Sequence, residues 1–289
     1  MYAAPFDYYR AATLAEAHQL LKDHPDAKLL AGGHSLLPLM KLRLAQPPAV
    51  VDIGRLAELR GISVQGDTLR IGALTTHAEL AASADVARAV PLLAEAAGMI
   101  GDPTIRNRGT IGGNVAHADP ASDLPTVLLA LGARFATAGP GGERTLDAKD
   151  FFQGLMTTAL KDDEVLTAIL VPALKKGEGS AYVKWSHPAS RYAVVGAAAI
   201  VGGGATISSA RIAVGGLVPH AIRAGAVEAA LAGQAPTADA IEKAAAKLSA
   251  DLGSSLIGDV FASAEFRGRV APVYVGRAIA TAAARAAKA

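Results

Sequence analysis

The stretch RGTIGGNVAHADPASDLP, from Arg108 to Pro125, carries two adjacent glycines, and LLAGGHSLLPLM, from Leu29 to Met40, carries a similar pair. Because glycine lacks a Cβ atom, it permits a positive φ and a close approach of the backbone to a ligand, with successive N–H groups directed at an anion. Two such loops predict a pyrophosphate held from two sides. The alternative is that both pairs are tight turns after buried strands, which is the commoner role of a Gly-Gly pair.

The residues around the glycine pairs favour a nucleotide over plain turns. Ser35 and Thr110 add hydroxyl donors for phosphate oxygens, and Asn114 can hold its loop or contact the ligand. Pro38 and Pro103 stiffen the flanks. The sequence contains no GxxxxGK[ST], and neither pair completes a GxGxxG after a strand. A nucleotide here would therefore be bound by neither a Walker nor a Rossmann loop.

The composition excludes several functions. The chain has 289 residues, no cysteine and a formal net charge of +2. Without cysteine it forms no disulfide, offers no thiolate nucleophile and holds no iron–sulfur cluster by itself. Dispersed Lys and Arg residues give little support for nucleic-acid binding. The sequence shows no run of about 18 apolar residues and no secretory signal, so we expect a cytoplasmic protein without a membrane span.

The seven histidines form no HExxH or similar cluster, so we expect no metal site. Two of them, His34 and His117, lie in the glycine loops and are expected near phosphate or sugar. Trp185 is expected to pack inward. The order of residues shows no Ser/His/Asp arrangement and no paired acid and base, so the sequence predicts no catalytic residue.

Short helices and strands alternate through the first half of the chain. Thr13 to Glu16 and Thr76 to Glu79 are capping boxes that begin helices. Strands are predicted at 27–31, 49–53, 62–66 and 68–74, the last two joined by a Gly66-Asp67 turn, and helices at 86–100 and from Pro125. After a polar linker at 175–180, three strands precede alanine-rich helices around 221–232, 237–251 and 263–287, and Pro272 is expected to break or kink the last.

Two stretches together resemble the FAD-binding medium subunit of molybdenum hydroxylases, the family that includes aerobic carbon monoxide dehydrogenase and xanthine dehydrogenase. They are LLAGGHSLLPLMKLRLAQPPAVVDI and TIRNRGTIGGNVAHADPASDLP. The resemblance covers essentially the whole chain. It implies an α+β fold of the vanillyl-alcohol oxidase type, with subdomains at about 1–56 and 57–176 forming an FAD-binding domain over 1–176. A C-terminal α/β domain with a small antiparallel sheet and helices would follow over 177–289.

The resemblance also implies a set of cofactor-binding residues. The first loop matches at Ala31, Gly32, Gly33, His34 and Ser35, and the second at Thr110, Ile111, Gly112, Gly113 and Asn114, both along the pyrophosphate. Single matching positions are Ile100, Asp123, Leu166, Lys184 and Tyr192, although ASRYA replaces the family's usual acidic residue beside the tyrosine. Asp123 could instead cap the helix begun by Pro125. A cation at Lys184 would stabilise the anionic reduced flavin.

By the same resemblance, FAD is bound noncovalently, and the partners are an iron–sulfur small subunit and a molybdopterin large subunit in a dimer of heterotrimers. Electrons would pass from [2Fe-2S] clusters to the flavin and on to an external acceptor. The absence of cysteine agrees, because such clusters need thiolates from another chain. Two alternatives remain open: a self-sufficient flavin-dependent oxidoreductase of this fold, such as an enolpyruvyl-sugar reductase or an oxidase, and a non-catalytic nucleotide-binding protein whose glycine pairs are turns.

Overall fold

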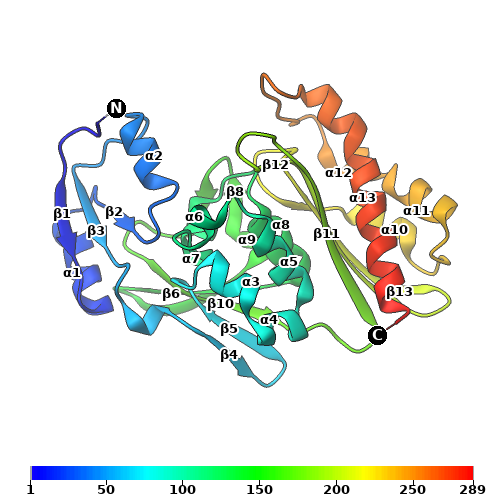
Figure 1. The fold of residues 1–289 in the computed structure, drawn as a ribbon, viewed down its shortest axis with the longest axis horizontal. Coiled ribbons are helices and arrows are strands. Elements are labelled where there is room, and N and C mark those ends of the chain that lie inside the picture. The colour runs from blue at the N-terminus through cyan, green and yellow to red at the C-terminus, as the bar shows by residue number, and fades with distance from the viewer. Residues whose placement is uncertain (1, 289) are drawn as a thin grey trace.

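The computed structural model describes residues 2–288, and its three main sheets follow one another along the length of the molecule (Figure 1). The N-terminal sheet lies at the left of that view, and the C-terminal sheet with its helices lies at the right. Helices and strands are mixed throughout, in agreement with the predicted α+β class. Within residues 2–288 we find no helix with the length and apolar character needed to cross a membrane.

The first sheet has three parallel strands in the order β1-β3-β2, namely β1 (Asp7–Arg10), β2 (Lys28–Leu30) and β3 (Ala49–Asp52). Between β1 and β2 runs α1 (Leu14–Asp23), and α2 (Leu36–Lys41) follows β2 after only a short loop. Thr13 caps α1 by accepting a hydrogen bond from the backbone N–H of Glu16. The Glu16 carboxylate accepts from the N–H of Ala12 instead of Thr13, so the predicted capping box forms only in part.

The central sheet is antiparallel, with five strands in the order β4-β5-β10-β6-β7. They span β4 (Ile62–Gln65), β5 (Thr68–Gly72), β6 (Arg134–Gly139), β7 (Gly142–Asp147) and β10 (Val165–Pro172). The predicted Gly66-Asp67 turn joins β4 to β5, and Gly66 adopts the positive φ of 59° that a two-residue hairpin turn demands. The short 3-10 helix η1 (Ala57–Leu59) precedes this hairpin, and α9 (Ala148–Phe151), β8 (Phe152–Gly154) and β9 (Thr157–Thr158) follow β7.

Five helices pack with the central sheet around one hydrophobic core, namely α3 (His77–Ala82), α4 (Ala84–Ala89), α5 (Pro91–Met99), α7 (Ile111–His117) and α8 (Asp123–Leu131). The short helix α6 (Pro103–Arg106) lies beside α3 and has no buried residue. The full capping box predicted at Thr76 and Glu79 is present at the start of α3. Every residue of α8 is buried, because this helix also packs against the C-terminal sheet. That position makes α8 the element through which the two halves of the molecule meet.

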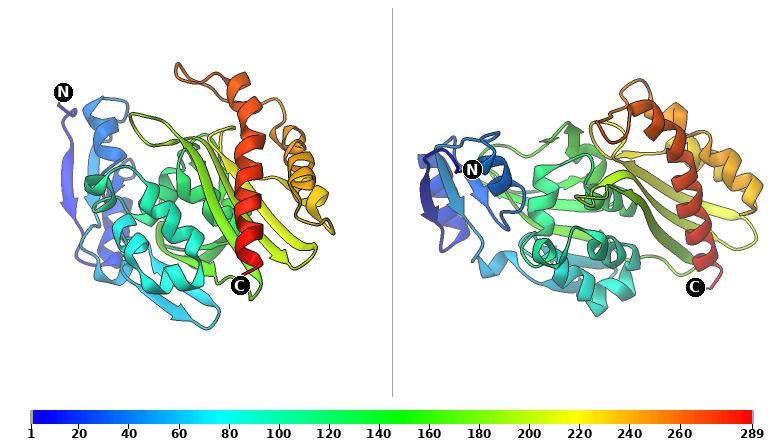
Figure 2. Two further views of the ribbon diagram at one scale, coloured as in Figure 1. Left: turned by 45° about the vertical axis from the view of Figure 1, so that its right-hand side comes forward. Right: turned by 45° about the horizontal axis from the view of Figure 1, so that its top comes forward.

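The C-terminal sheet is antiparallel in the order β11-β12-β13-β14, with β11 (Glu178–Ser186), β12 (Ala193–Gly203), β13 (Ile207–Gly215) and β14 (Ile222–Arg223). Its helices are α10 (Gly225–Leu231), α11 (Ala238–Ala245), α12 (Leu248–Leu252) and α13 (Ala264–Ala286). β12 is buried over nearly its whole length because α8 and α13 both pack on it. Figure 2 shows α13, in red, lying along this sheet.

Four predicted helices differ from those in the structure. The segment 86–100 is two helices, since Pro91 begins α5 as a new helix after α4 ends. The segment 237–251 divides into α11 and α12, and the chain begins the segment at 221–232 with β14 before α10. A break at Pro272 is wrong, because α13 continues through it. The buried face of α13, including Ala271, Val275 and Ile279, holds the helix together against the cost of the proline.

Candidate cofactor site

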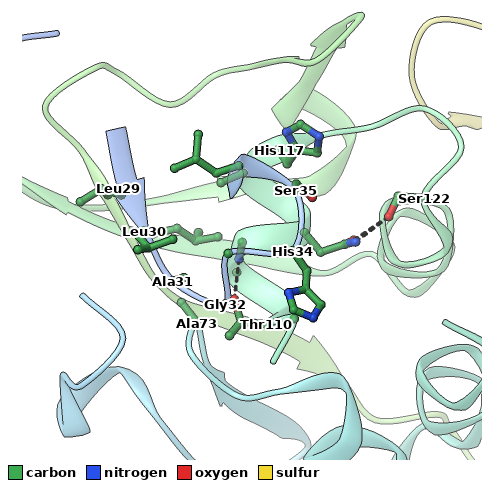
Figure 3. A pocket seen from close by; sticks show the side chains of 18 of the residues that line it. Leu29, Leu30, Ala31, Gly32, His34, Ser35, Ala73, Thr110, His117 and Ser122 are labelled. Atoms are coloured by element: carbon green, nitrogen blue, oxygen red, sulfur yellow. Dashed lines mark hydrogen bonds between the residues drawn. The ribbon is translucent and has the colours of Figure 1, made fainter. Parts of the chain in front are cut away.

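A cavity of about 660 Å³ lies between the first sheet, the central helices and the C-terminal domain. This volume falls within the range of roughly 300–1,000 Å³ that ligand sites in proteins occupy. Its walls come from the loop after β2, the start of α7, the β8–β9 hairpin and the loop between β11 and β12. Figure 3 shows the segment from Leu29 to Ser35 passing close to Thr110 and the helix that follows it.

The first glycine loop forms one wall of the cavity and contacts the second loop directly. A Cβ atom on Gly32 would lie 2.0 Å from the carbonyl oxygen of Arg108, and only glycine fits that contact. Gly33 has a φ of +78°, a conformation that glycine adopts without strain. Among residues 2–288, no backbone acceptor takes the N–H groups of Gly33, His34 or Ser35. These N–H groups are therefore free to donate to an anion in the cavity.

The second glycine pair lies in the first turn of α7, where its N–H groups already have partners. The N–H of Ile111 donates to Thr75 O, and that of Gly112 donates to Ala73 O. The N–H of Gly113 donates to the Thr110 hydroxyl at 3.1 Å. This loop therefore provides a close-packed wall, while the donors come from the first loop.

Glycine is also required at position 112 by packing. A Cβ atom on Gly112 would lie 2.5 Å from the Cβ of Ala73. Asn114, one turn into α7, exchanges hydrogen bonds with the Ser122 hydroxyl at 2.6 and 2.9 Å. Of the two roles predicted for Asn114, the structure shows it holding the loop. Both glycine pairs thus serve close approach between segments at a cavity, which plain turns would not require.

Asp123 lines the cavity at the N-terminus of α8 and is 4% exposed. Its carboxylate accepts hydrogen bonds from the Tyr182 hydroxyl at 2.6 Å and from Lys184 Nζ at 2.9 Å. Ser122 occupies the N-cap position, so the alternative role of Asp123 as the cap is wrong. Burial raises the pKa of Asp123, while the charge of Lys184 and the hydrogen bond from Tyr182 act in the opposite direction.

Lys184 lies behind Asp123 and does not line the cavity. Its Nζ donates to the carbonyl oxygens of Met99 at 3.1 Å and Arg191 at 2.8 Å as well as to Asp123. Ile111 is the other predicted residue that does not line the cavity, because its side chain is fully buried in the core. Lys184 therefore lies behind the cavity wall, where its hydrogen bonds hold Asp123 and Arg191, two residues that line the cavity.

The remaining predicted positions all lie on the cavity wall. They are Ala31, Gly32, Gly33, His34, Ser35, Ile100, Thr110, Gly112, Gly113, Asn114, Leu166 and Tyr192. His117, expected near phosphate or sugar, lies there too. Tyr192 is 39% exposed at the C-terminal side, and burial, with a smaller contribution from the charge of Asp119, raises the pKa of its hydroxyl. Trp185 packs inward against Phe261 and Phe266, as expected.

Some residues of the site escaped the sequence analysis. His77, the first residue of α3, lines the cavity while only 3% exposed, and its Nδ1 has no hydrogen-bond partner in the described chain. Burial, followed by the charges of His34 and Arg106, lowers its pKa to about 4. The neutral ring also packs so closely on Gly109 that a Cβ there would lie 2.8 Å from it. The capping box at Thr76 predicted the helix but carried no signal for the ring's direction.

Two further segments reach the cavity from outside both glycine loops. The β8–β9 hairpin contributes Met156, Thr157 and Thr158, and the loop before β12 contributes Ser190 and Arg191. No glycine pattern marks either segment. Both reach the site through the folding of distant parts of the chain.

Known proteins match the whole chain. Residues 4–174 match a family model described as the FAD binding domain in molybdopterin dehydrogenase, and residues 180–282 match the CO dehydrogenase flavoprotein C-terminal domain. The carbon monoxide dehydrogenase medium chain of Hydrogenophaga pseudoflava is 46% identical over 83% of this chain and 84% of its own. The nicotine 6-hydroxylase medium subunit of Paenarthrobacter nicotinovorans is 37% identical over 96% of this chain and 97% of its own.

Solved structures give the same result. Carbon monoxide dehydrogenase from Hydrogenophaga pseudoflava superposes with a TM-score of 0.95 at 44% identity, covering 99% of both chains. Quinoline 2-oxidoreductase from Pseudomonas putida 86 gives a TM-score of 0.94 at 33% identity, covering 99% of this chain and 100% of the other. These matches confirm the predicted fold class, with an FAD-binding part followed by a flavoprotein C-terminal domain, and the predicted relationship to subunits of oxidoreductases.

Proposed function

The chain belongs to the molybdopterin dehydrogenase FAD-binding family, in its carbon monoxide dehydrogenase medium-chain group, and we propose that it serves as the electron-transfer flavoprotein of a multi-subunit molybdenum hydroxylase. In this role it takes electrons from [2Fe-2S] clusters on an iron–sulfur subunit and passes them to an external acceptor. A molybdopterin subunit carries the substrate reaction, and the three chains pair as a dimer of heterotrimers.

The observation that carries the proposal is the cavity between the two glycine loops. The unpaired N–H groups of Gly33, His34 and Ser35 suit the two phosphates of FAD, since backbone donors bind anions well. The direct contact of Gly32 with Arg108 keeps the first loop against the second, so these donors share one narrow wall. The residues present therefore fit a dinucleotide such as FAD.

Bound FAD supplies the redox chemistry, because it accepts and releases one or two electrons. This chain's residues hold and orient it. Ile100 and Leu166 would give an apolar wall for the ring, and Tyr192, on the wall at the C-terminal side, would contact it. Asp123 offers a buried acceptor, and His77 offers a neutral imidazole at the cavity wall. We propose no acid or base on this chain for the substrate reaction.

The names of the relatives support assembly with other chains, since several are medium chains or subunits of larger enzymes. The relatives act on unlike substrates, as the names nicotine 6-hydroxylase and caffeine dehydrogenase indicate, yet the medium subunit of the first and subunit beta of the second are 37% and 35% identical to this chain. This similarity supports the proposal that another subunit selects the substrate. We further propose that the FAD-binding domain spans 1–176, with subdomains 1–56 and 57–176, and that the C-terminal domain spans 177–289.

The test is the visible spectrum of the purified chain supplied with excess FAD, with the supernatant examined after heat release. We expect a flavin spectrum and free FAD in the supernatant, which together mean noncovalent binding. The same preparation, assembled with an iron–sulfur and a molybdopterin partner subunit, should bleach when substrate is added. A chain that takes up no FAD, either alone or in that assembly, contradicts the proposal.

A further inference from the structure

Two side chains of β11 reach from the C-terminal sheet to Asp123, a residue on the wall of the cofactor cavity. Tyr182 and Lys184 are two residues apart on one strand and therefore point to the same face. Their polar ends contact one carboxylate: Tyr182 Oη lies 2.6 Å from Asp123 Oδ1, and Lys184 Nζ lies 2.9 Å from Asp123 Oδ2. Tyr182 is 3% exposed and belongs to the core shared with α8. The hydroxyl is thus a buried polar group whose partner lines the cavity.

The neighbouring strand leaves room for this hydroxyl. Gly196 of β12 lies opposite Lys184 in the ladder, and a Cβ atom on it would lie 2.6 Å from Tyr182 Oη. Its φ is not positive, so the glycine is required by space and not by backbone conformation. Glycine inside a strand weakens the strand, because it adds entropy to the unfolded chain and packs no side chain. In return, the glycine leaves the space in which the Tyr182 hydroxyl is held beside Asp123.

The ammonium of Lys184 depends on the same arrangement. Its three N–H groups donate to Asp123, to Met99 O and to Arg191 O, so none remains free. Met99 precedes Ile100 on the cavity wall, and Arg191 precedes Tyr192 in the loop before β12. Hydrogen bonds through Asp123 and Lys184 therefore link the start of α8, the end of α5 and the loop before β12.

We propose that Tyr182 is a positioning residue of the flavin site, whose hydroxyl fixes the Asp123 carboxylate as an ionised acceptor facing the cofactor. The inference rests on the proposed function, because it assigns Asp123 to the environment of bound FAD. Tyr182 itself does not line the cavity and acts only through Asp123.

The electrostatics of the cluster support this role. Burial and the neighbouring Asp123 raise the pKa of Tyr182 well above its usual value, so the phenol keeps its proton and remains a donor. Burial pushes Asp123 towards its neutral form, and the donors Tyr182 and Lys184 oppose that effect. Arg191 and Tyr192 are further ionisable groups on the cavity wall, and the charge of Asp119 acts on Tyr192. Removal of the phenol therefore moves Asp123 towards protonation, and a negative charge beside the flavin is lost.

The test compares the full chain loaded with FAD with three variants. Tyr182→Phe removes the hydroxyl and keeps the ring. Gly196→Ala keeps the tyrosine but forces its hydroxyl from its place, and Tyr274→Phe removes a phenol from α13, outside the cavity, as the control. For each we would measure the midpoint potential of the bound FAD between pH 6 and 9, its dissociation constant and the unfolding temperature without FAD.

We expect the potential of the Tyr182→Phe protein to be higher than wild type near neutral pH, because loss of a negative charge favours the anionic reduced flavin. The difference should shrink as the pH rises and Asp123 ionises in both proteins. Gly196→Ala should shift the potential in the same direction, and Tyr274→Phe should leave it unchanged. A merely structural role would change the unfolding temperature without a pH-dependent shift in potential.

The outcomes separate the inference from the function on which it rests. If wild type binds FAD and Tyr182→Phe matches its potential at every pH, the inference is overturned while the proposed function stands. If wild type takes up no FAD, alone or with its partner subunits, the proposed function is contradicted and the inference fails with it.

Discussion

Replacement of Gly32 by alanine tests whether the two glycine loops must touch. The φ of Gly32 is not positive, so alanine meets no backbone strain and the contact alone is perturbed. Its Cβ would lie 2.0 Å from Arg108 O and 2.9 Å from Gly109 Cα, both backbone atoms. Since real Cβ contacts do not fall below 3.0 Å, the loops must separate by about 1 Å. Overpacking of this kind costs about 1–3 kcal/mol of folding free energy.

The same displacement carries the donors of the first loop away from the opposite wall. Loss of one hydrogen bond to a charged group costs about 1.5–3 kcal/mol. The dissociation constant for FAD should therefore rise roughly tenfold to a hundredfold. Gly32→Ala should weaken FAD binding and also lower the unfolding temperature of the FAD-free chain.

Quenching of flavin fluorescence on titration measures the affinity, and thermal unfolding without FAD measures the stability. Gly98→Ala is the matched control, because Gly98 is an exposed position of α5 whose added Cβ would lie 4.0 Å from the nearest atom, the Cβ of Ala81. Alanine there should leave FAD binding unchanged and raise stability by up to about 1 kcal/mol. A Gly32→Ala chain with wild-type affinity and wild-type unfolding temperature would refute the reasoning about the loop contact.

Three further predictions concern the same cavity. FAD binding should be abolished by Gly33→Val, because Gly33 has a positive φ, and by Gly113→Val, because a Cβ there would lie 2.8 Å from the Thr110 hydroxyl. Full flavin occupancy in either variant would show that the loop assignment is wrong. Glu164 accepts two hydrogen bonds from Arg144, at 2.5 and 2.6 Å, and this partner lowers the pKa of Glu164. Glu164→Gln should therefore lower the free energy of unfolding in urea by about 2 kcal/mol at pH 7, and by little in acid below the lowered pKa. His77 stays neutral in the folded chain because its pKa of about 4 lies below the usual 6.5, so the free energy of unfolding should fall by about 3 kcal/mol as the pH drops from 6.5 to 4. His77→Phe should remove that loss, and an equal loss in the variant would contradict the prediction.

Much of the fold was predictable because its signals are local. The Gly66-Asp67 turn and the capping box at Thr76 each depend on residues within four positions, and both are present. Helix continuity was harder to predict, because a proline can begin a helix or lie within one. Pro91 begins α5, whereas Pro272 lies inside α13. Tertiary packing decides between these outcomes, since α13 packs on β11 and β12, which end some 60 or more positions earlier.

The break between α11 and α12 has a similar origin. The periodic apolar pattern of 237–251 predicts one helix, and the chain remains helical in character at Lys247. The N–H of Lys247, however, donates to Ala244 O and that of Ala250 to Lys247 O, which are bonds over three residues. This tighter turn separates two short helices without any proline or glycine. No single residue in the sequence marks it.

The residues of the candidate site also divide into those that the local sequence predicts and those that only tertiary packing brings to the site. Positions 31–35 and 110–114 are contiguous, so a motif predicts them, and most line the cavity. Motif reasoning assigned Lys184 a place beside the flavin because a cation there has an electronic rationale. In the structure its ammonium donates to Asp123, 61 residues earlier, and Asp123 in turn lines the cavity. Only the packing of α8 against β12 and β13, beside β11, shows which partner the ammonium meets.

That packing explains why the C-terminal domain belongs to the cofactor site. α8 is buried on all sides because the central core covers one face and the C-terminal sheet covers the other. Its first residue, Asp123, would be a buried carboxylate without donors if β11 were absent, and such a group carries a large desolvation cost. Tyr182 and Lys184 supply those donors, and the loop that follows β11 supplies Tyr192 to the cavity wall. The geometry at Asp123 is therefore set by the C-terminal sheet, although the glycine loops that first identify the site lie wholly outside it.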